Sequence, residues 1–266
     1  MLETPYRAFD DTHVIPSYAP VPGLGLLPIN SFVIKAREPV LFDTCAPIDR
    51  DAFLDTLRSV IDPVELKWIV LSHADRDHSG NVEEVLEAAP NARLVANWAT
   101  IGKLTGEFDV PMERVFRVNL GQSFSAGDRD LAIVSTPIFD SAGTIGMYDA
   151  TNGALFSVDA FGSFIPSHVD NAGDVPQAEF AEKFNIWNQA NHPWVTMADQ
   201  HKFDEALKEV WDLKPTSILS SHLPPAHGRT DDLMKALSKV PALEPFIGPD
   251  QATVDAMMAQ MGGPPH

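Results

Sequence analysis

The chain has 266 residues, of which 44% are hydrophobic and 21% charged, as expected for a globular protein with a sizeable core. The formal net charge of −18 argues against nucleic acid or an anionic membrane as a partner, because both would be repelled. The single cysteine, Cys45, excludes an intramolecular disulfide framework. It follows the apolar run Val40–Phe42, so we expect a core residue in a reducing compartment.

The N-terminal residues Met1–Pro5 have neither the basic nor the apolar segment of a signal peptide. No apolar run approaches the length of a membrane span. We therefore expect a cytoplasmic protein that does not associate with a membrane.

The first half of the chain alternates predicted strands and helices. Pro and Gly residues in 12–30 predict an irregular segment before the first regular strand. Strands are then expected at 31–36, 39–44 and 67–71, and helices at 51–61 and 81–89.

Further short strands are expected near 93–96, 115–118, 131–135 and 154–158. The later half is predicted to be more helical, with helices at 176–190 and 203–213 before a final strand at 217–220, and the chain shows no repeat or dividing linker. In the last helix Phe203, Leu207, Val210 and Trp211 share one face. This pattern predicts one domain of two sheets covered by helices, with the functional loops at the strand ends.

The most informative segment is the loop His73–Asn81, directly after the apolar strand at 67–71. Within six residues it carries two imidazoles, His73 and His78, and two carboxylates, Asp75 and Asp77. Buried strand ends rarely carry four titratable groups without a partner charge. Imidazole and carboxylate together suit a hard or borderline divalent ion, so the loop is predicted to bind metal.

Three further apolar strands end in residues of the same kind. Asp140 follows the strand near 131–135, Asp159 follows 154–158, and His222 follows 217–220. Taken alone, each residue suits an ordinary turn equally well. Together with the loop they supply three His and four Asp, which is enough for two adjacent metals with one bridging carboxylate.

These motifs resemble the metallo-β-lactamase superfamily, whose signature loop is H-x-H-x-D-H. More narrowly, Asp75 in place of the second histidine resembles the diiron domain of flavodiiron proteins and related oxygen-binding diiron proteins. The string Leu155–Gly162 is similar to the bridging-aspartate motif of that group, and Phe184–Trp187 is also similar. The resemblance covers about residues 28 to 230. It implies an α/β fold of the metallo-β-lactamase type, an αββα sandwich of two mixed β-sheets flanked by helices.

The resemblance also implies a set of metal ligands. It assigns His73, Asp75 and the residue at 140 to one metal, and it puts Asp159 between the two metals. It assigns the following residues to the other metal: Asp77, His78 and His222.

The chain departs from the family at Asp140, where a histidine is usual. The preceding Thr136-Pro137 and the following Gly143 still mark the position. Asp140 could ligate the first metal or hold a water, or the first site could be weakened or empty.

Four carboxylates to three imidazoles form a harder ligand set than hydrolytic zinc sites use. The expected cofactor is therefore two iron ions, with zinc or manganese as the alternative and no flavin in this chain. The leading hypothesis is a non-haem diiron protein that binds or reduces O2, with NO as a second possible ligand.

Two other functions stay open at this stage. One is a zinc-dependent hydrolase of an ester, lactone or thioester, in which Asp77 would orient a hydroxide. The other is a signalling or binding module whose altered first site no longer supports catalysis.

The domain prediction is a single diiron domain over residues 1–266, with no flavodoxin domain. Reduction of O2 or NO would then need a separate flavoprotein or reductase, whereas a chain without one would suit an oxygen sensor. By resemblance we also expect a homodimer.

Overall fold

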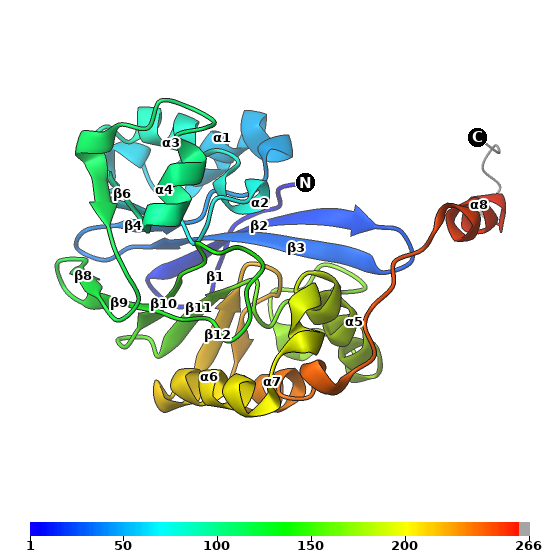
Figure 1. The fold of residues 1–266 in the computed structure, drawn as a ribbon. Helices are drawn as coiled ribbons and strands as arrows, with labels where there is room; N and C mark the ends of the chain where they lie inside the picture. The colour runs from blue at the N-terminus through cyan, green and yellow to red at the C-terminus, as the bar shows by residue number, and fades with distance from the viewer. Residues whose placement is uncertain (261–266) are drawn as a thin grey trace.

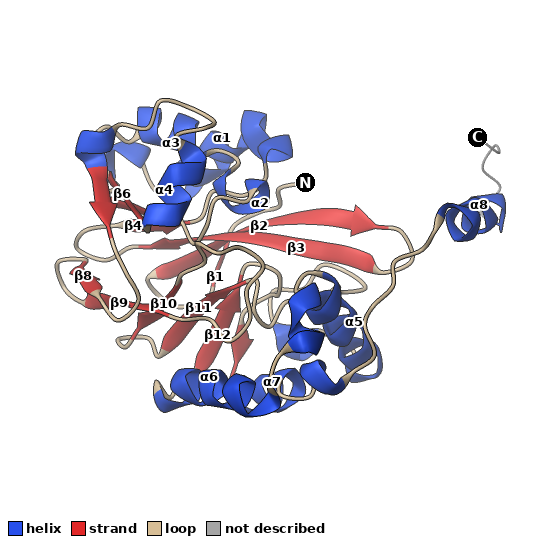
Figure 2. Ribbon diagram, in the orientation of Figure 1, coloured by secondary structure: helices blue, strands red, loops and turns tan. Residues whose placement is uncertain are grey.

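The computed structural model describes residues 1–260, and residues 261–266 lie outside the described part of the chain. The fold is α/β, with two mixed sheets flanked by helices, which confirms the predicted class (Figure 2). Helices α1 to α4 cover the outer face of the first sheet, and α5 to α7 cover the second (Figure 1). Among the described residues, no helix is long and apolar enough to cross a membrane.

The first sheet follows chain order from β1 to β7, antiparallel as far as β4 and parallel from β4 onwards. Its strands are β1 (Tyr6–Arg7), β2 (Thr12–Val21), β3 (Gly25–Ile34), β4 (Val40–Phe42), β5 (Trp68–Val70), β6 (Arg93–Ala96) and β7 (Val115–Arg117). Its helices are α1 (Arg50–Val60), α2 (Arg76–Ser79), α3 (Val82–Ala88) and α4 (Trp98–Leu104).

The second sheet has the order β13-β12-β11-β10-β9-β8, in which β11 and β12 are parallel and the other neighbours are antiparallel. Its strands are β8 (Ser123–Ser125), β9 (Asp130–Val134), β10 (Gly146–Asp149), β11 (Ala154–Val158), β12 (Ser217–Ser220) and β13 (Ala226–His227). The remaining helices are α5 (Gln177–Ala190), α6 (Gln200–Asp212), α7 (Thr230–Leu237) and α8 (Gln251–Gln260). Helix α8 lies apart from both helical layers (Figure 1).

The prediction of an irregular segment at 12–30 is wrong, because β2 and β3 form a long antiparallel hairpin over these residues. Strand β1 pairs with β2 only at His13 and Val14, and β4 pairs with β3 only from Phe32 onwards. Pro28 therefore lies beyond β4, and Pro16 lies beyond β1, where its carbonyl still accepts a hydrogen bond from the Glu3 N–H at 2.9 Å. A missing N–H is tolerated at such positions. Proline content alone could not reveal that parts of β2 and β3 extend beyond their pairing with β1 and β4.

The other predicted strands and helices are all present, with shifts of a few residues at their ends. On α6, Phe203, Leu207 and Val210 are buried as predicted, but Trp211 is 41% exposed. Helix α4 was not predicted. Its N-cap residue is Asn97, whose side-chain Oδ1 accepts a hydrogen bond from the Thr100 N–H at 2.9 Å.

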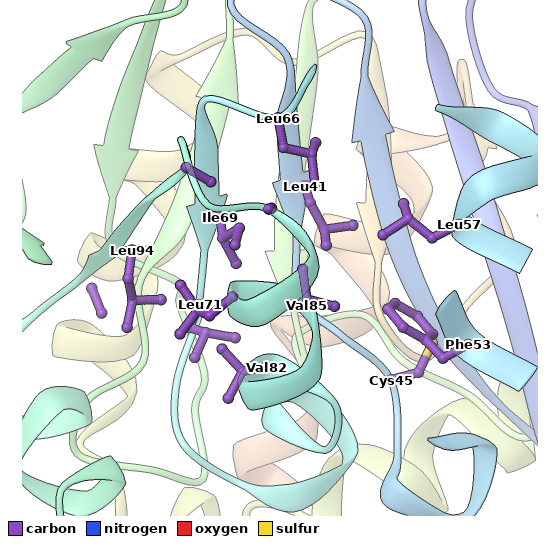
Figure 3. Packing of buried hydrophobic residues seen from close by; sticks show 14 of the residues in the cluster. Leu41, Cys45, Phe53, Leu57, Leu66, Ile69, Leu71, Val82, Val85 and Leu94 are labelled. Atoms are coloured by element: carbon purple, nitrogen blue, oxygen red, sulfur yellow. The ribbon is translucent and has the colours of Figure 1, made fainter. Parts of the chain in front are cut away.

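Between the first sheet and its helices lies an apolar core, shown in Figure 3. Phe53 and Leu57 of α1 point toward the sheet beside Leu41 of β4, and all three side chains are fully buried. Cys45 is also fully buried in this core, which confirms the predicted structural role. Burial raises the pKa of the Cys45 thiol to about 12, so the thiol stays protonated and unreactive near neutral pH.

The two sheets pack on each other through three buried phenylalanines, Phe32, Phe42 and Phe156. The ring centroid of Phe156, on β11, lies 5.3 Å from those of both other rings. Phe156 is three residues before Asp159, so this packing fixes the strand that leads to Asp159.

We expect Phe156→Ala to lower the free energy of unfolding by about 3–5 kcal/mol, because it leaves a cavity between the sheets. Urea unfolding followed by circular dichroism measures this loss. Phe246→Ala is the control, since Phe246 is 37% exposed and its truncation should change stability by no more than about 0.5 kcal/mol. Equal effects of the two substitutions would contradict the packing argument.

Candidate metal centre

The candidate ligands lie at the carboxyl ends of strands that run in one direction within each sheet. In the first sheet β4 and β5 are parallel, and in the second β9, β11 and β12 share a direction. Such strands send their carboxyl ends to the same edge of a sheet. The loops that follow β5, β9, β11 and β12 carry all seven residues predicted from the sequence.

The loop after β5 closes into one helical turn, α2. The N–H groups of His78 and Ser79 both donate to the Asp75 carbonyl, at 3.0 and 2.9 Å. Ser79 Oγ donates to the Ala74 carbonyl at 3.0 Å. This turn presents His73, Asp75, Asp77 and His78 toward one space within a very short segment.

The structure brings together all seven residues of the predicted set. Three groups have their ligand-type atoms within 4.8 Å of one another. The groups are His73, Asp75 and Asp140; Asp77, His78 and His222; and His73, His78 and Asp159. The first two groups coincide with the two sets expected from the resemblance, and the third joins them.

Asp159 lies between the two groups and offers one carboxylate oxygen to each. Its Oδ1 is 3.0 Å from His222 Nε2 and 3.2 Å from His78 Nε2. Its Oδ2 is 3.7 Å from His73 Nε2. The same arrangement would let one carboxylate bridge two cations.

His73 Nε2 faces three carboxylates at distances too long for hydrogen bonds. It is 3.5 Å from Asp140 Oδ1, 3.7 Å from Asp159 Oδ2 and 3.8 Å from Asp75 Oδ2. Ligands that lie roughly 2.0–2.2 Å from a common metal are about 3–3.5 Å from each other. The space beside His73 Nε2 is therefore close to the size that a cation requires.

The second group is arranged around His78 and His222. Asp77 Oδ2 lies 3.4 Å from His222 Nε2 and 3.7 Å from His78 Nε2. Both imidazoles are buried, whereas the Asp77 side chain remains 35% exposed. The carboxylate therefore lies on the open side of this group.

Two buried atoms of the cluster without hydrogen-bond partners indicate whether a cation fits there. His73 Nε2 and Asp159 Oδ2 have no hydrogen-bond partner among the described residues 1–260. A buried polar atom without a partner costs roughly 1–3 kcal/mol. A divalent cation between these two atoms would satisfy both, so the residues present fit a metal.

Charges within the cluster shift the pKa values of its members. Burial, with a smaller contribution from His78, lowers the pKa of His73, which leaves a neutral imidazole suited to ligation. Burial alone would lower the pKa of His78, but Asp77, Asp159 and Asp43 outweigh it and raise that pKa. Burial and the carboxylates of Asp159 and Asp75 raise the pKa of Asp140 to about 6.

For Asp159, burial opposes ionisation, but His78 and His73 outweigh burial and hold the pKa of the carboxyl well below its usual range. The pKa of Asp77 is likewise lowered by His78 and His222 against the effect of burial. Both carboxylates are thus charged at neutral pH and available to a cation.

Asp43 is a contributing residue that the sequence analysis missed. Its Oδ2 accepts a hydrogen bond from His78 Nδ1 at 2.8 Å, and its Oδ1 accepts one from the Ser72 N–H at 2.8 Å. The bond to Nδ1 turns His78 Nε2 toward the cluster. Asp43 follows β4, so it lies at an apolar strand end like the predicted residues, and that pattern was its only signal.

The remaining imidazoles are also held through Nδ1. His222 Nδ1 donates to the Pro28 carbonyl at 2.7 Å, and His73 Nδ1 lies 3.1 Å from Ser72 Oγ. These contacts leave Nε2 of each ring facing the cluster, so the three rings are oriented before any ligand binds.

Trp187 of α5 holds the segment after Asp159 in place. Its Nε1 donates to the Asp159 carbonyl at 3.1 Å, and its ring lies 4.5 Å from that of His222. Gly162 permits this approach, since a Cβ there would overlap Trp187 Nε1 and lie 2.8 Å from His222 Cβ. Gly162 and Trp187 belong to the two segments that resemble the diiron group, and they lie in close contact with each other. Close packing therefore explains why both segments resemble that group.

Fold and cluster together define the class: a metallo-β-lactamase-like domain with a candidate His/Asp metal site. Residues 27–222 match the profile described as ODP family beta lactamase. The chain belongs to this family, the metallo-β-lactamase-like diiron domain of flavodiiron proteins.

Curated relatives agree with this assignment. The chain is 33% identical over 159 residues to diflavin flavoprotein A 1 of a Synechocystis species, covering 59% of this chain and 27% of the relative. It is 27% identical over 218 residues to the anaerobic nitric oxide reductase flavorubredoxin of Vibrio vulnificus, covering 76% and 44%. The chain thus spans less than half the length of these relatives.

Solved structures show the same fold. Rubredoxin oxygen:oxidoreductase of Desulfovibrio gigas matches with a TM-score of 0.76 and 20% identity, over 90% of this chain and 61% of that one. The flavodiiron protein of Giardia intestinalis matches with a TM-score of 0.78 and 17% identity, over 88% and 58%.

We expect Asp43→Asn to weaken metal binding roughly 10- to 100-fold. The reason is that the NH2 group of the asparagine would face a hydrogen-bond donor, either the Ser72 N–H or the N–H of His78 Nδ1. Competition between the apo-protein and a chelator for Fe²⁺ under nitrogen measures the loss. Asp49→Asn is the matched control, since Asp49 is also buried but accepts from Ser17 Oγ, outside the cluster. An unchanged affinity in Asp43→Asn would show that Asp43 does not orient His78.

Gly162→Ala should lower the free energy of unfolding by about 1–3 kcal/mol, because the new methyl group displaces Trp187 or His222. Gly102→Ala in α4 is the control, since its Cβ would meet no atom within 4 Å. That control should raise stability by about 0.5–1 kcal/mol. Thermal or urea unfolding of the two variants compares them directly, and similar effects would refute the close approach at Gly162.

Proposed function

We propose that this protein is a non-haem diiron protein that binds or reduces O2, with NO as a second possible ligand. The observation that carries the proposal is the position of Asp159, whose two oxygens face separate groups of candidate ligands. The set of four carboxylates and three imidazoles supports iron or manganese over zinc, because hard oxygen ligands outnumber nitrogen ligands.

In this proposal His73, Asp75 and Asp140 would hold one iron and Asp159 would bridge to the other. The second iron would be held by Asp77, His78 and His222. When bound, the two irons would supply the redox change and the sites at which O2 or NO attaches.

The protein groups would orient the ligands and limit access of water. Nε2 of His73, His78 and His222 faces the centre from buried positions that are at most 1% exposed. The carboxylates of Asp75, Asp77 and Asp140 are 41%, 35% and 21% exposed and form the open side. A small ligand would therefore enter past these carboxylates.

Two of the similar proteins are named for the proposed reactions, an oxygen oxidoreductase from Desulfovibrio gigas and a nitric oxide reductase from Vibrio vulnificus. We propose that the present residues form a single diiron domain, and that electrons come from a flavoprotein or other reductase outside these 266 residues. Without such a donor the domain would serve as an oxygen sensor or binding protein. A homodimer is also part of the proposal.

The test is metal content and oxygen response of protein purified under nitrogen from iron-replete cells. We expect about two irons per chain and a near-ultraviolet absorption band that grows when air is admitted. Asp159→Asn should lose most of the iron, because it removes the charge shared by the two groups, whereas Asp49→Asn should keep it.

Other outcomes would contradict the proposal in distinguishable ways. Protein that holds no iron and takes up none anaerobically would exclude a diiron function. Bound zinc, no oxygen response and turnover of a lactone or thioester would favour the hydrolase instead.

A further inference from the structure

Asp75 and Asp140, the two carboxylates of the first group, each have one oxygen in contact with a hydrogen-bond donor from another segment. Asp75 Oδ1 lies 3.3 Å from Lys103 Nζ, while its Oδ2 faces His73 Nε2. Asp140 Oδ2 accepts from Asn191 Nδ2 at 3.2 Å, while its Oδ1 faces His73 Nε2. In both residues one oxygen is directed into the site and the other is occupied by a donor.

Lys103 reaches Asp75 from α4, which is attached to the loop that carries Asp140. Lys103 Nζ donates to Ser141 Oγ at 2.6 Å, and the Asn97 and Thr100 side chains donate to the Gly143 carbonyl at 2.9 and 3.3 Å. A Cβ at Gly143 would lie 2.7 Å from Thr100 Oγ1, so only glycine permits this contact. One lysine therefore links Asp75 with the residue next to Asp140.

Asn191 reaches Asp140 from a different element, since it directly follows α5. Three residues later, Trp194 Nε1 donates to the Phe139 carbonyl at 2.6 Å, and the Phe139 and Trp194 rings lie 5.1 Å apart. Asp140 is thus fixed both through its own carboxylate and through the backbone before it.

We infer that Lys103 and Asn191 are positioning residues that hold Asp75 and Asp140 as one-oxygen ligands of the first metal. This inference rests on the proposed function and makes Asp140 a ligand, rather than a sign of an empty site. It also gives Lys103 a second role as the cation that offsets the charge brought by Asp140.

The aspartate at position 140 adds a negative charge to the first group. An aspartate in place of a neutral histidine puts a third carboxylate around His73 Nε2, beside Asp75 and Asp159. Like charges this close repel one another and disfavour the ionised forms that a metal needs. The Lys103 ammonium is a cation in direct contact with this group, through Asp75.

The experiment is an Fe²⁺ titration under nitrogen of the apo-protein, with a competing chelator, for wild type, Lys103→Met and Asn191→Leu. Wild type should bind two equivalents. Each variant should bind one equivalent as wild type does and the other roughly 10- to 100-fold more weakly. Lys103→Arg, which keeps the charge, should recover part of the lost affinity.

Lys67→Met is the matched control, because Lys67 is exposed at the opposite end of β5 from the ligand loop. It removes one positive charge and should leave both equivalents unchanged. Unfolding of the apo-proteins should show equal stability for Lys103→Met and Lys67→Met, which separates ligand positioning from a general loss of structure.

A second measurement tests the charge role. Asp140→His removes the additional negative charge, so Lys103→Met should weaken iron binding less in an Asp140→His background than in wild type. Equal losses in the two backgrounds would refute the charge role.

The positioning role is overturned if Lys103→Met and Asn191→Leu bind both equivalents as wild type does, or lose both equally. Wild type that binds no iron would instead refute the proposed function, together with the inference that rests on it.

Discussion

The carboxylate of Asp159 is the contact on which the arrangement of the site depends, because its two oxygens face imidazoles from two different groups. A fully buried carboxylate needs opposite charge or hydrogen bonds on both oxygens. His78 and His222 supply them to Oδ1, whereas Oδ2 has no hydrogen-bond partner within residues 1–260. The position of Asp159 is in turn set by the apolar packing of β11 between the sheets and by Trp187 behind its carbonyl.

The fold provides this geometry because parallel strands deliver successive loops to one edge. Short loops after β5, β11 and β12 can therefore converge although they are far apart in sequence. The carbonyls and carboxylates behind the rings then fix which nitrogen faces inward. Asp43 does this for His78, and Pro28, on the long hairpin, does it for His222. The hairpin is thus part of the site, through a backbone carbonyl.

In the first group, position 140 carries an aspartate where the resemblance leads us to expect a histidine. An aspartate at 140 supplies an oxygen close to His73 Nε2, as a ligand would, but adds a charge. Lys103 and Asn191 contact the carboxylates from α4 and from the segment after α5. Both contacts lie on the open side of the cluster, where they can also affect how a small ligand approaches.

The sequence by itself determined the seven residues of the cluster, because apolar strands that end in His or Asp and the short His73–His78 spacing are visible in neighbouring residues. The fold type and the division of the seven residues into two groups came from the resemblance of these motifs to the diiron domain. Only the tertiary structure revealed the hairpin across Pro16 and Pro28, and the contacts of Asp43, Lys103 and Asn191. Those contacts join residues 28 to 51 positions apart. They depend on how the helices and the two sheets pack together, which no local pattern of residues encodes.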